Sequence, residues 1–513
     1  MPSWGDGYVT DIEYSDGFYA AQSPAHLALA ATLNGVEPPD LSGHFAACEL
    51  GCGRGQTALV FAAVNPQAEF HAIDFHPAHI AHARSRAQQA GLRNIQFHEY
   101  SFDELTGPRG ETLPMFDVIT MHGVWSWIAP KLQNAIIAFI NARLKPGGLV
   151  YVSYNALPAW NPVAPLQWII KELADASRSR SDVAITRVLT QLQQLASTNV
   201  IPKKYHDGIK KIQDTAERLL QYVAHEYLNE YWQPVYHADV ARSFAGAKMS
   251  FAASTDLLKN FYNLSLTEDQ RKALADISSD ELRETLKDFC TDHWFREDVF
   301  VRGARNIRPA QRERNFLQQK LVLVRPPPDI IEIARPDGSK WCPDPVVYDA
   351  VIAALRRGPR LVAELLRLDG LPPNHLVGPV ELLGVMLGTG LAGIYTEPTA
   401  EEQASAARFN SLFDSDPELP LTRGATLAVP AMHSGLTLTA ANFALYQDLR
   451  KGRNPTADSL ADRFIARCHA TGCHPVLDGK TYEDDAEARI ALRAEYQMKL
   501  DRVVPLWKNL GMI

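Results

Sequence analysis

The sequence predicts an α/β fold whose core is a parallel β-sheet, followed by a mainly helical C-terminal region. Three observations support this prediction. Strand-like and helix-like segments alternate over residues 47–155, a glycine-rich turn ends the first strand-like segment, and the alternation disappears after residue 160. Strands separated by helices of roughly 10–15 residues form right-handed βαβ units with parallel strands.

The bounds of the predicted strands and helices follow from apolar runs and from the residues that mark helix ends. Pro77 and Gly91 mark the start and end of the second helix, because proline favours the first turn and glycine the position after the last one. A KPGG turn at 145–148 separates the third helix from the fifth strand. The predicted strands are 47–53, 69–75, 95–100, 116–123 and 149–155, and the predicted helices are 56–64, 77–91 and 129–144.

Residues 160–245 form a predicted helical insertion, with helical apolar spacing over 212–232. HEYL at 225–228 lies on that amphipathic helix, and we interpret it as structural. Two later strand candidates, at 248–254 and 298–303, flank a helical stretch and can extend the sheet at its far edge.

RPPPD at 325–329 is the strongest linker candidate, because consecutive prolines form a stiff, extended connection. Beyond it, three short helical segments and a hairpin-like segment at 391–398 resemble a winged-helix module. The predicted division comprises an N-terminal lid segment (1–42), a core sheet region (43–159), a helical insertion (160–245), the late strands (246–310), a winged-helix-like domain (329–400) and a mainly helical domain (401–513).

Composition excludes several classes of protein. The chain has 513 residues, 46% of them hydrophobic, which is enough to bury a large core. Its net charge of −8 makes nucleic acid an unexpected partner. We expect no membrane insertion, because the apolar runs are far shorter than the roughly 20 residues a membrane helix needs. Six cysteines and an N-terminus without an apolar signal core predict a reducing, cytoplasmic location.

ELGCGRG at 49–55 stands between a predicted strand and a predicted helix. Its glycines allow a tight turn and close approach of the backbone to a ligand. Asp74 ends the next strand, where an acid can accept hydrogen bonds from both hydroxyls of a ribose. The alternative is a packing turn with an unrelated surface acid.

Two ligands suit such a turn, a dinucleotide and S-adenosylmethionine (SAM). A dinucleotide site prefers a third glycine where this chain has Gln56. Glu49 before the first glycine suits the amino end of a methionine moiety instead.

Residues 47–155 resemble the class I SAM-dependent methyltransferases, from ELGCG through AIDF to LKPGG. A closer resemblance, to methyltransferases that carry a regulatory domain, covers most of the chain. That family includes rickettsial protein-lysine methyltransferases. The motifs that carry this resemblance are YSDGFYAAQSPAHL (14–27), MHGVWSWI (121–128), LVYVSYNALPAW (149–160) and AHEYLNEYWQPVY (224–236).

This resemblance implies a Rossmann-like, seven-stranded sheet, with SAM as cofactor and S-adenosylhomocysteine as product. Glu49 corresponds to the acid that contacts the methionine amino group, and Asp74 to the ribose acid. Ser101 stands where relatives often place an aspartate on the adenine, with Asp103 two residues later. The implied cofactor contacts are Glu49, Gly51, Cys52, Gly53, Asp74, Phe75, Ser101, Phe102, His122 and Gly123.

Methyl transfer is an in-line displacement that depends on orientation and exclusion of water, so it requires no catalytic dyad. Aromatic rings suit the acceptor side, because they attract cations. Trp125 and Tyr154 follow the fourth and fifth strands, and Tyr14 lies in the N-terminal segment with Tyr8, Phe18 and Tyr19. We therefore take Trp125, Tyr154 and Tyr14 as catalytic candidates, the alternative being that these rings pack in the core or lie on the surface. CHATGCH at 468–474 lacks a distant partner pair, so no metal site is expected.

The resemblance and the long C-terminal region predict a methyltransferase that acts on lysine side chains of a protein. A small-molecule or glycan methyltransferase is the alternative among enzymes. A non-enzymatic SAM-binding regulator or scaffold is the alternative of another class. A protein substrate is the expected partner, and a homodimer remains open.

Overall fold

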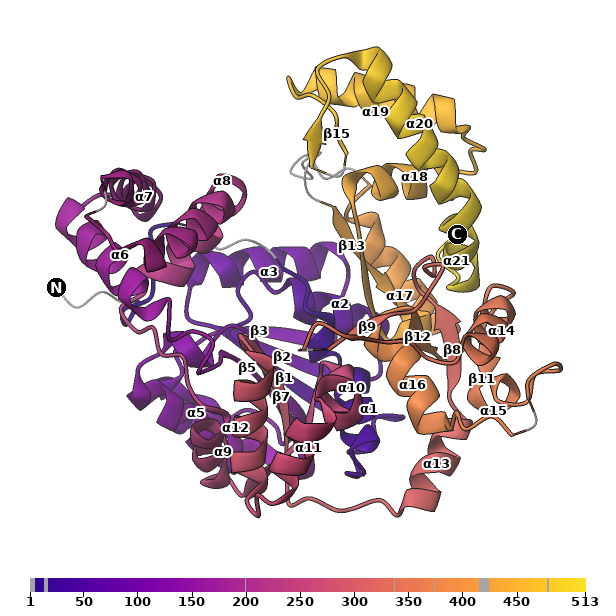
Figure 1. Ribbon diagram of the computed structural model, residues 1–513, viewed down its shortest axis with the longest axis horizontal. Helices are drawn as coiled ribbons and strands as arrows, with labels where there is room; N and C mark the ends of the chain where they lie inside the picture. The colour runs from indigo at the N-terminus through magenta and orange to yellow at the C-terminus, as the bar shows by residue number, and fades with distance from the viewer. Residues whose placement is uncertain are drawn as a thin grey trace. The chain divides into compact units, whose positions relative to one another are not determined.

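The computed structural model describes residues 5–12, 17–198, 200–335, 337–372, 374–414, 424–477 and 479–513. The chain divides into two compact units (Figure 1). The first comprises Met1–Ala58, Gln67–Ser85 and Ile95–Asn306, and the second comprises Leu59–Pro66, Arg86–Asn94 and Ile307–Ile513.

A seven-stranded sheet forms the centre of the first unit, with strand order β3-β2-β1-β4-β5-β7-β6. The first five strands run parallel, and β7 runs antiparallel to both β5 and β6. The two late strand candidates of the sequence are therefore confirmed as the far edge of the sheet. The strands are β1 (Ala46–Leu50), β2 (Glu69–Asp74), β3 (Ile95–Glu99), β4 (Phe116–Met121), β5 (Leu144–Asn155), β6 (Met249–Ser254) and β7 (Phe295–Arg302).

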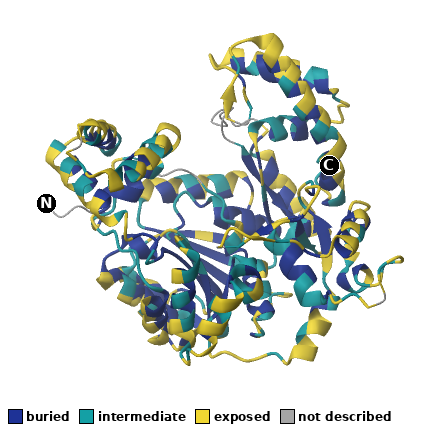
Figure 2. Ribbon diagram, in the orientation of Figure 1, coloured by how far each residue is buried: buried dark blue, intermediate teal, exposed yellow. Residues whose placement is uncertain are grey.

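The central strands are continuous apolar runs because a parallel sheet is covered on both faces. Every residue of β1 and β4 is buried, and the strands of the sheet are drawn mostly in dark blue in Figure 2. Ile136 and Phe139 of α5 (Pro130–Arg143) and Phe244 of α9 (His237–Ala245) join these strands in one hydrophobic cluster. This packing holds the carboxyl ends of the strands in place, where open α/β sheets bind ligands.

The remaining helices of the first unit follow the expected pattern of starts and stops. Proline occupies the first turn of α1, α4, α5 and α6. The helices are α1 (Pro24–Leu33), α2 (Gln56–Val64), α3 (Pro77–Gln89), α4 (Pro108–Glu111), α6 (Ala164–Ser177), α7 (Ser181–Ser197), α8 (His206–Leu228), α10 (Tyr262–Ser265), α11 (Glu268–Ala275) and α12 (Asp280–Thr291). From Leu59 onward α2 belongs to the second unit, and so does the end of α3 from Arg86.

The helical insertion has a hydrophobic core of its own. Apolar side chains of α6, α7 and α8 form one buried cluster, which includes Ile170, Val188 and Val223. Val9 of the N-terminal segment is part of the same cluster. The N-terminal segment is thus held to the insertion by apolar packing.

In the second unit, a three-stranded sheet of order β11-β8-β12 packs with short helices. β8 (Lys320–Leu323) pairs with both β11 (Arg360–Leu361) and β12 (Ala392–Tyr395). The proline segment at 325–329 therefore lies inside this unit, because the strand before it belongs to the same sheet as strands after it. The expected hairpin arm at 391–398 is a single strand whose partner is β8, and the winged-helix resemblance stays a prediction. The helices are α13 (Pro309–Leu317), α14 (Pro345–Leu355), α15 (Val362–Leu365) and α16 (Pro379–Gly388).

The end of the chain is mainly helical, as expected. Capping boxes at Thr399 and Thr456 fix the starts of two helices, because each threonine accepts a backbone N–H that the helix leaves unpaired. The elements are α17 (Ala400–Ser411), the hairpin of β13 (Ala425–Val429) and β14 (Ser434–Leu438), α18 (Ala440–Arg450), α19 (Ala457–Ala470), α20 (Asp485–Arg502) and α21 (Val504–Asn509). Four two-residue strands, β9 (Ile333–Ala334), β10 (Lys340–Trp341), β15 (Val476–Leu477) and β16 (Lys480–Thr481), complete the unit.

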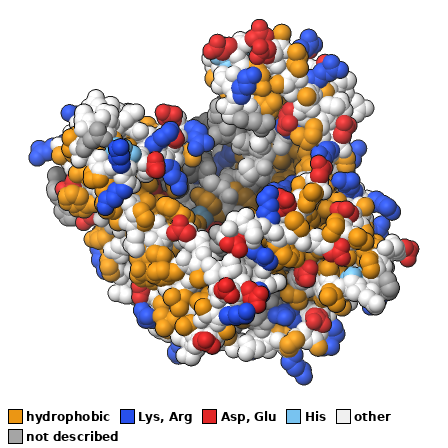
Figure 3. Space-filling model, viewed as in Figure 1, with side chains coloured by type: hydrophobic (Ala, Val, Ile, Leu, Met, Phe, Trp, Pro, Cys, Tyr) orange, Lys and Arg blue, Asp and Glu red, His pale blue; other side chains and the backbone are white. Residues whose placement is uncertain are grey.

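The charges on the surface and the apolar character of the helices are relevant to possible partners. Basic and acidic side chains are intermixed on the face shown in Figure 3. Within the described part of the chain, no helix combines the length and apolar character that a membrane crossing requires.

Candidate functional site

The glycine-rich turn at the carboxyl end of β1 has a backbone that only glycine adopts without strain. Gly51, Gly53 and Gly55 have φ angles of +73°, +52° and +80°. A Cβ on Gly51 would lie 2.5 Å from Val124 Cγ2, whereas a Cβ on Gly53 would meet nothing within 4 Å. The turn is therefore packed tightly below Gly51 and open beside Gly53, where a ligand can approach the backbone.

Asp74 faces this turn from the end of β2. Its Oδ2 accepts a hydrogen bond from the N–H of Gly53 at 2.8 Å, and its Oδ1 accepts one from the N–H of His76 at 2.9 Å. The side chain is buried. His79 Nδ1 makes a third, longer contact with Oδ1 at 3.4 Å. A carboxylate has about four lone-pair positions, so Oδ2 retains capacity for a ribose hydroxyl.

Glu49 is a buried acid with one oxygen in need of a donor. Its Oε1 accepts a hydrogen bond from Gln22 Nε2 at 3.1 Å, and its Oε2 has no hydrogen-bond partner among the described residues. Burial raises the pKa of Glu49 to about 8, although Gln22 and the N–H of Ala58 act in the opposite direction. A ligand ammonium would supply the missing donor and the opposite charge, so the site fits the amino end of SAM.

Cys52, between two glycines of the turn, has a buried thiol. Its N–H donates to the carbonyl of Ile73 at 3.0 Å. Burial raises the pKa of Cys52, with further contributions from Asp74 and Glu49. The thiol is therefore protonated near neutral pH, which suits a small packing residue.

Ser101 and Phe102 follow β3, beside the turn. The N–H of Ser101 donates to Glu104 Oε2 at 2.9 Å, and its hydroxyl donates to Asp103. Phe102 packs against the core cluster and lies 3.8 Å from a Cβ built on Gly51. Ser101 thus bonds both Asp103 and Glu104, the two acids that follow it.

His122 and Gly123 follow β4. The His122 Nδ1 lies 2.7 Å from the Tyr151 hydroxyl oxygen, and that hydroxyl donates to Glu297 at 2.8 Å. Burial lowers the pKa of His122 to about 3, so the ring is neutral near pH 7. The N–H of Gly123 donates to Ser153 Oγ at 2.8 Å. These bonds fix the loop beside the glycine-rich turn and present a neutral ring there.

The N-terminal segment brings two tyrosines to this end of the sheet. The Tyr19 ring stacks on His122 with centroids 3.7 Å apart, and the Tyr8 ring meets Phe75 edge-on at 6.0 Å. Backbone bonds hold the segment, because the N–H of Tyr19 donates to Thr57 Oγ1 at 3.2 Å and the N–H of Val9 to Asn229 Oδ1 at 2.9 Å. Phe75 thereby lies between Asp74 and an aromatic neighbour.

Two of the three catalytic candidates of the sequence, Trp125 and Tyr154, lie among the buried residues of the first unit. Trp125 is 2% exposed and packs in the core against Phe244, with centroids 5.3 Å apart. Tyr154 is fully buried, and its hydroxyl donates to Asp298 at 2.6 Å. Both rings are therefore enclosed by protein in the ligand-free chain, and their catalytic role stays a prediction. Tyr14 lies outside the described residues.

Sequence reasoning missed Glu226, on the last turn of α8. Its Oε1 accepts a hydrogen bond from Asn155 Nδ2 at 2.9 Å, and Asn155 is the last residue of β5. Glu226 was part of the HEYL segment that we interpreted as structural. A charged residue on the buried face of an amphipathic helix was the signal that could have identified it.

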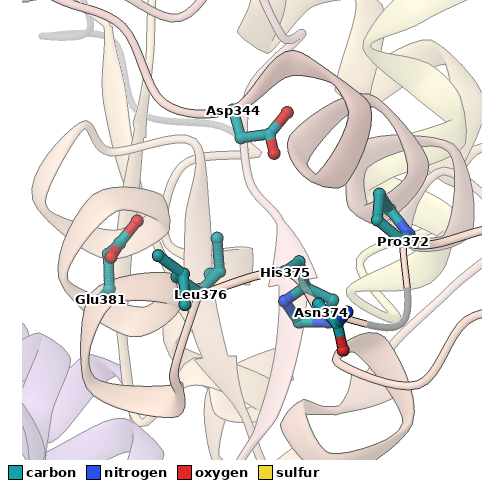
Figure 4. A pocket seen from close by; sticks show the side chains of 7 residues that line it. Asp344, Pro372, Asn374, His375, Leu376 and Glu381 are labelled. Carbon is teal, nitrogen blue, oxygen red and sulfur yellow. The ribbon is translucent and has the colours of Figure 1, made fainter.

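A surface pocket in the second unit offers no comparable chemistry (Figure 4). Its acid Asp344 caps α14 by accepting the N–H of Val346 at 3.0 Å, and its His375 ring bonds the Leu366 carbonyl at 3.2 Å. The described residues also contain no cluster of three or more His, Cys, Asp or Glu arranged to hold a metal ion. The pocket is lined by Asp344, Pro372, Asn374, His375, Leu376, Val377 and Glu381.

Comparison with known proteins gives two family matches and several relatives. Residues 48–150 match a family described as "Methyltransferase domain", and residues 220–302 match one described as "Predicted methyltransferase regulatory domain". The protein sll1526 of Synechocystis sp. is 32% identical over 496 residues, which cover 94% of this chain and 95% of that protein. RP789 of Rickettsia prowazekii is 28% identical over 246 residues, 44% of each chain.

Among solved structures, PKMT2 from Rickettsia typhi in complex with AdoHcy superposes with a TM-score of 0.68 at 18% identity. The superposition covers 97% of this chain and 99% of that one. The two chains therefore share their fold along nearly their whole length.

Proposed function

This chain belongs to the class I SAM-dependent methyltransferases that carry a methyltransferase regulatory domain, and on that premise we propose that it methylates lysine side chains of a protein. SAM is its cofactor and S-adenosylhomocysteine (AdoHcy) the product. When bound, SAM supplies a methyl group on a positively charged sulfur.

We propose that the turn and its neighbours hold the cofactor. Glu49 binds the ammonium through its unpaired oxygen, Asp74 binds the ribose hydroxyls, and Phe75 covers the adenine. The neutral ring of His122 faces the sulfonium without charge repulsion. The proposed contacts are Glu49, Gly51, Cys52, Gly53, Asp74, Phe75, Ser101, Phe102, His122 and Gly123.

The observation that supports an amine as the methyl acceptor is the aromatic enclosure formed by the N-terminal segment. Tyr8 and Tyr19 lie over the ends of β2 and β4, next to Phe75 and His122. Aromatic faces attract ammonium and sulfonium groups by about 0.5–2 kcal/mol. The same segment excludes water and so favours attack by a desolvated amine over hydrolysis.

A protein is the proposed acceptor because the chain devotes a whole second unit to something other than SAM binding. The likeness to PKMT2, a protein lysine methyltransferase, supports the same choice. We further propose a cytoplasmic location, which is supported by six free thiols, and a homodimer as the assembly to test.

Incubation of the purified protein with radiolabelled SAM and a cell extract tests this function. We expect label in protein, and methyl-lysine in its peptides by mass spectrometry. Label in small metabolites or glycans would contradict a protein acceptor. SAM binding without any transfer would indicate a scaffold, and an Asp74→Asn variant controls for label that the enzyme does not transfer.

A further inference from the structure

Glu226 is a buried acid at the carboxyl end of the sheet. It is 5% exposed and lies on the last turn of α8. The bond from Asn155 joins it to the end of β5, and the N–H of Asn155 donates to Ser126 Oγ at 2.9 Å, in the loop after β4. Helix α8 therefore delivers this carboxylate to the edge of the sheet where the cofactor contacts lie.

The surroundings of Glu226 overlap with those of the cofactor contacts. The Tyr8 ring lies 5.4 Å from the ring of His225, the neighbour of Glu226, and 6.0 Å from the ring of Phe75, the neighbour of Asp74, measured between centroids. Tyr19 in turn stacks on His122. One tyrosine thus connects Glu226 with the ribose acid, and a second lies against the loop after β4.

Among the described residues that shift the pKa of Glu226, none carries a positive charge. Its polar neighbours are neutral: the Asn155 amide, the Trp232 indole and the Tyr222 hydroxyl. Elsewhere in the same unit, buried Glu284 and Asp298 are paired with Arg296 at 3.0 and 2.9 Å. A buried carboxylate is costly unless it is paired, so Glu226, like Glu49, is a buried acid of this unit that can receive a cation from outside.

We propose that Glu226 binds the ammonium of the acceptor beside the transferred methyl group and removes its proton, an inference that rests on the proposed amine methylation. The proton moves from the ammonium nitrogen to a carboxylate oxygen of Glu226. The nitrogen lone pair then forms a bond to the methyl carbon as the carbon–sulfur bond breaks, with its electron pair left on sulfur. Glu226 releases the proton to water after the product leaves.

The ionisation of Glu226 suits this task. Burial raises the pKa of Glu226 to about 7, while the hydrogen bond from Asn155 and the polar neighbours Trp232 and Tyr222 act in the opposite direction. A base is most effective when its pKa lies near the working pH. The titratable groups around Glu226 and the cofactor contacts come from four parts of the chain. They are Tyr8 and Tyr19 from the N-terminal segment, Tyr222, His225 and Tyr227 from α8, His122 after β4, and Asp74 at the end of β2.

Sinefungin tests the inference without a protein substrate. It resembles AdoHcy but carries an amine on the carbon that replaces the sulfur, so its ammonium occupies the region of the methyl group. By calorimetry we expect the wild-type chain to bind sinefungin about tenfold or more tightly than AdoHcy near pH 8, because a charge-assisted hydrogen bond forms. The preference should fall between about pH 8 and 6 as Glu226 becomes protonated; Glu49 affects both ligands alike and cancels in the ratio.

Glu226→Gln should abolish most of this preference while AdoHcy affinity stays within about twofold, because glutamine keeps the oxygen that accepts from Asn155. Glu226→Asp should restore part of it, and Glu217→Gln, an exposed acid on the same helix, should change neither affinity. An unchanged preference in a Glu226→Gln variant that binds AdoHcy normally would overturn the proposal. If Glu226→Gln loses AdoHcy binding through misfolding, Glu226→Asp and the pH dependence of the wild type decide.

The two proposals fail in different ways. Absence of protein methylation together with a Glu226-dependent sinefungin preference would refute only the lysine acceptor. Methylation of lysine by the Glu226→Gln variant at the wild-type kcat, with an unchanged pH profile, would refute only the role of Glu226.

Discussion

Asp74 combines two tasks in one carboxylate. It accepts N–H groups from Gly53 and His76, which ties the end of β2 to the glycine-rich turn. The lone pairs that remain point to a ribose as the second partner. Because both backbone bonds and ligand bonds use the same group, its substitution should affect binding more than folding.

Asp74→Asn should weaken AdoHcy binding by about 1.5–3 kcal/mol, since a charged acceptor of hydrogen bonds becomes neutral. Isothermal titration calorimetry measures this loss. Glu99→Gln is the matched control, because Glu99 is exposed and pairs with Asp74 across β2 and β3. Equal affinity of Asp74→Asn and wild type would show that the ribose acid is misassigned.

Glu49 makes the stability of the ligand-free protein depend on pH. Its pKa is about 8 in the folded chain against an ordinary 4.5. The fold therefore favours the protonated acid, and ionisation costs stability increasingly as the pH rises from about 4.5 to 8.

Glu49→Gln should accordingly raise the melting temperature of the ligand-free protein near pH 8.5, with a smaller gain near pH 5. The same variant should bind AdoHcy at least about tenfold more weakly, because the ligand ammonium loses its counter-charge. Thermal melts and calorimetry measure the two effects, with the exposed Glu111→Gln as control. A lower melting temperature at both pH values would contradict this account.

At the scale of elements, β7 is joined to α12 by a buried ionic cluster. Arg296 is 2% exposed and bonds Asp298 at 2.9 Å, Asp288 at 2.8 Å and Glu284 at 3.0 Å. Burial would raise the pKa of Glu284, but Lys287 and Arg296 together lower it to about 2. The cluster also holds Tyr154 in place, because its hydroxyl donates to Asp298.

Arg296→Met should destabilise the fold by about 3–5 kcal/mol, because it leaves buried carboxylates without their cation. In the wild type, the ionised Glu284 adds to the free energy of unfolding above about pH 4.5. This stabilisation is lost as the pH falls towards 2, since the pKa of Glu284 is lowered in the folded state. Urea unfolding at pH 7 and pH 3.5 should show a smaller effect of the substitution at the lower pH. Arg242→Met, which breaks an exposed pair with Asp239, should cost less than about 1 kcal/mol.

On the scale of the whole molecule, all six cysteines are free and unequally accessible. Cys342 and Cys473 are exposed, Cys290 is half-buried, and Cys48, Cys52 and Cys468 are buried. The packing of both units, rather than any cross-link, therefore carries the stability of the chain.

A thiol reagent should consequently modify Cys342 and Cys473 rapidly, Cys290 more slowly and the other three cysteines only after denaturation. Absorbance at the released thiolate counts the groups. The melting temperature should be the same with and without reductant. Rapid modification of all six cysteines in the native protein would contradict the burial described.

Much of the fold was predictable because its signals are local. Apolar runs, the glycine-rich turn and proline at helix starts identified the strands and helices of the sheet within a few residues. The position of Asp74 followed from its place at a strand end. The second unit was less predictable, because β8 pairs with β12 about 70 residues further along and no local pattern states that partner.

The residues considered for the acceptor side show the same division between local signals and contacts with distant segments. Trp125 and Tyr154 stand at strand ends, as expected, yet the direction of their rings depends on Phe244 and Asp298, which are far away in the sequence. Glu226 meets Asn155 across 71 residues, and Val9 meets Asn229 across 220.

Residue order alone was sufficient for the parallel sheet and for placing the glycine-rich turn and Asp74 at the ends of its strands, because short-range periodicity and strand-end position encode them. Which acids are paired, which aromatic rings are enclosed and which carboxylate stands ready for an acceptor depended on contacts between distant segments. Those contacts are set by how helices pack on the sheet, and a single sequence does not encode that packing in any local pattern.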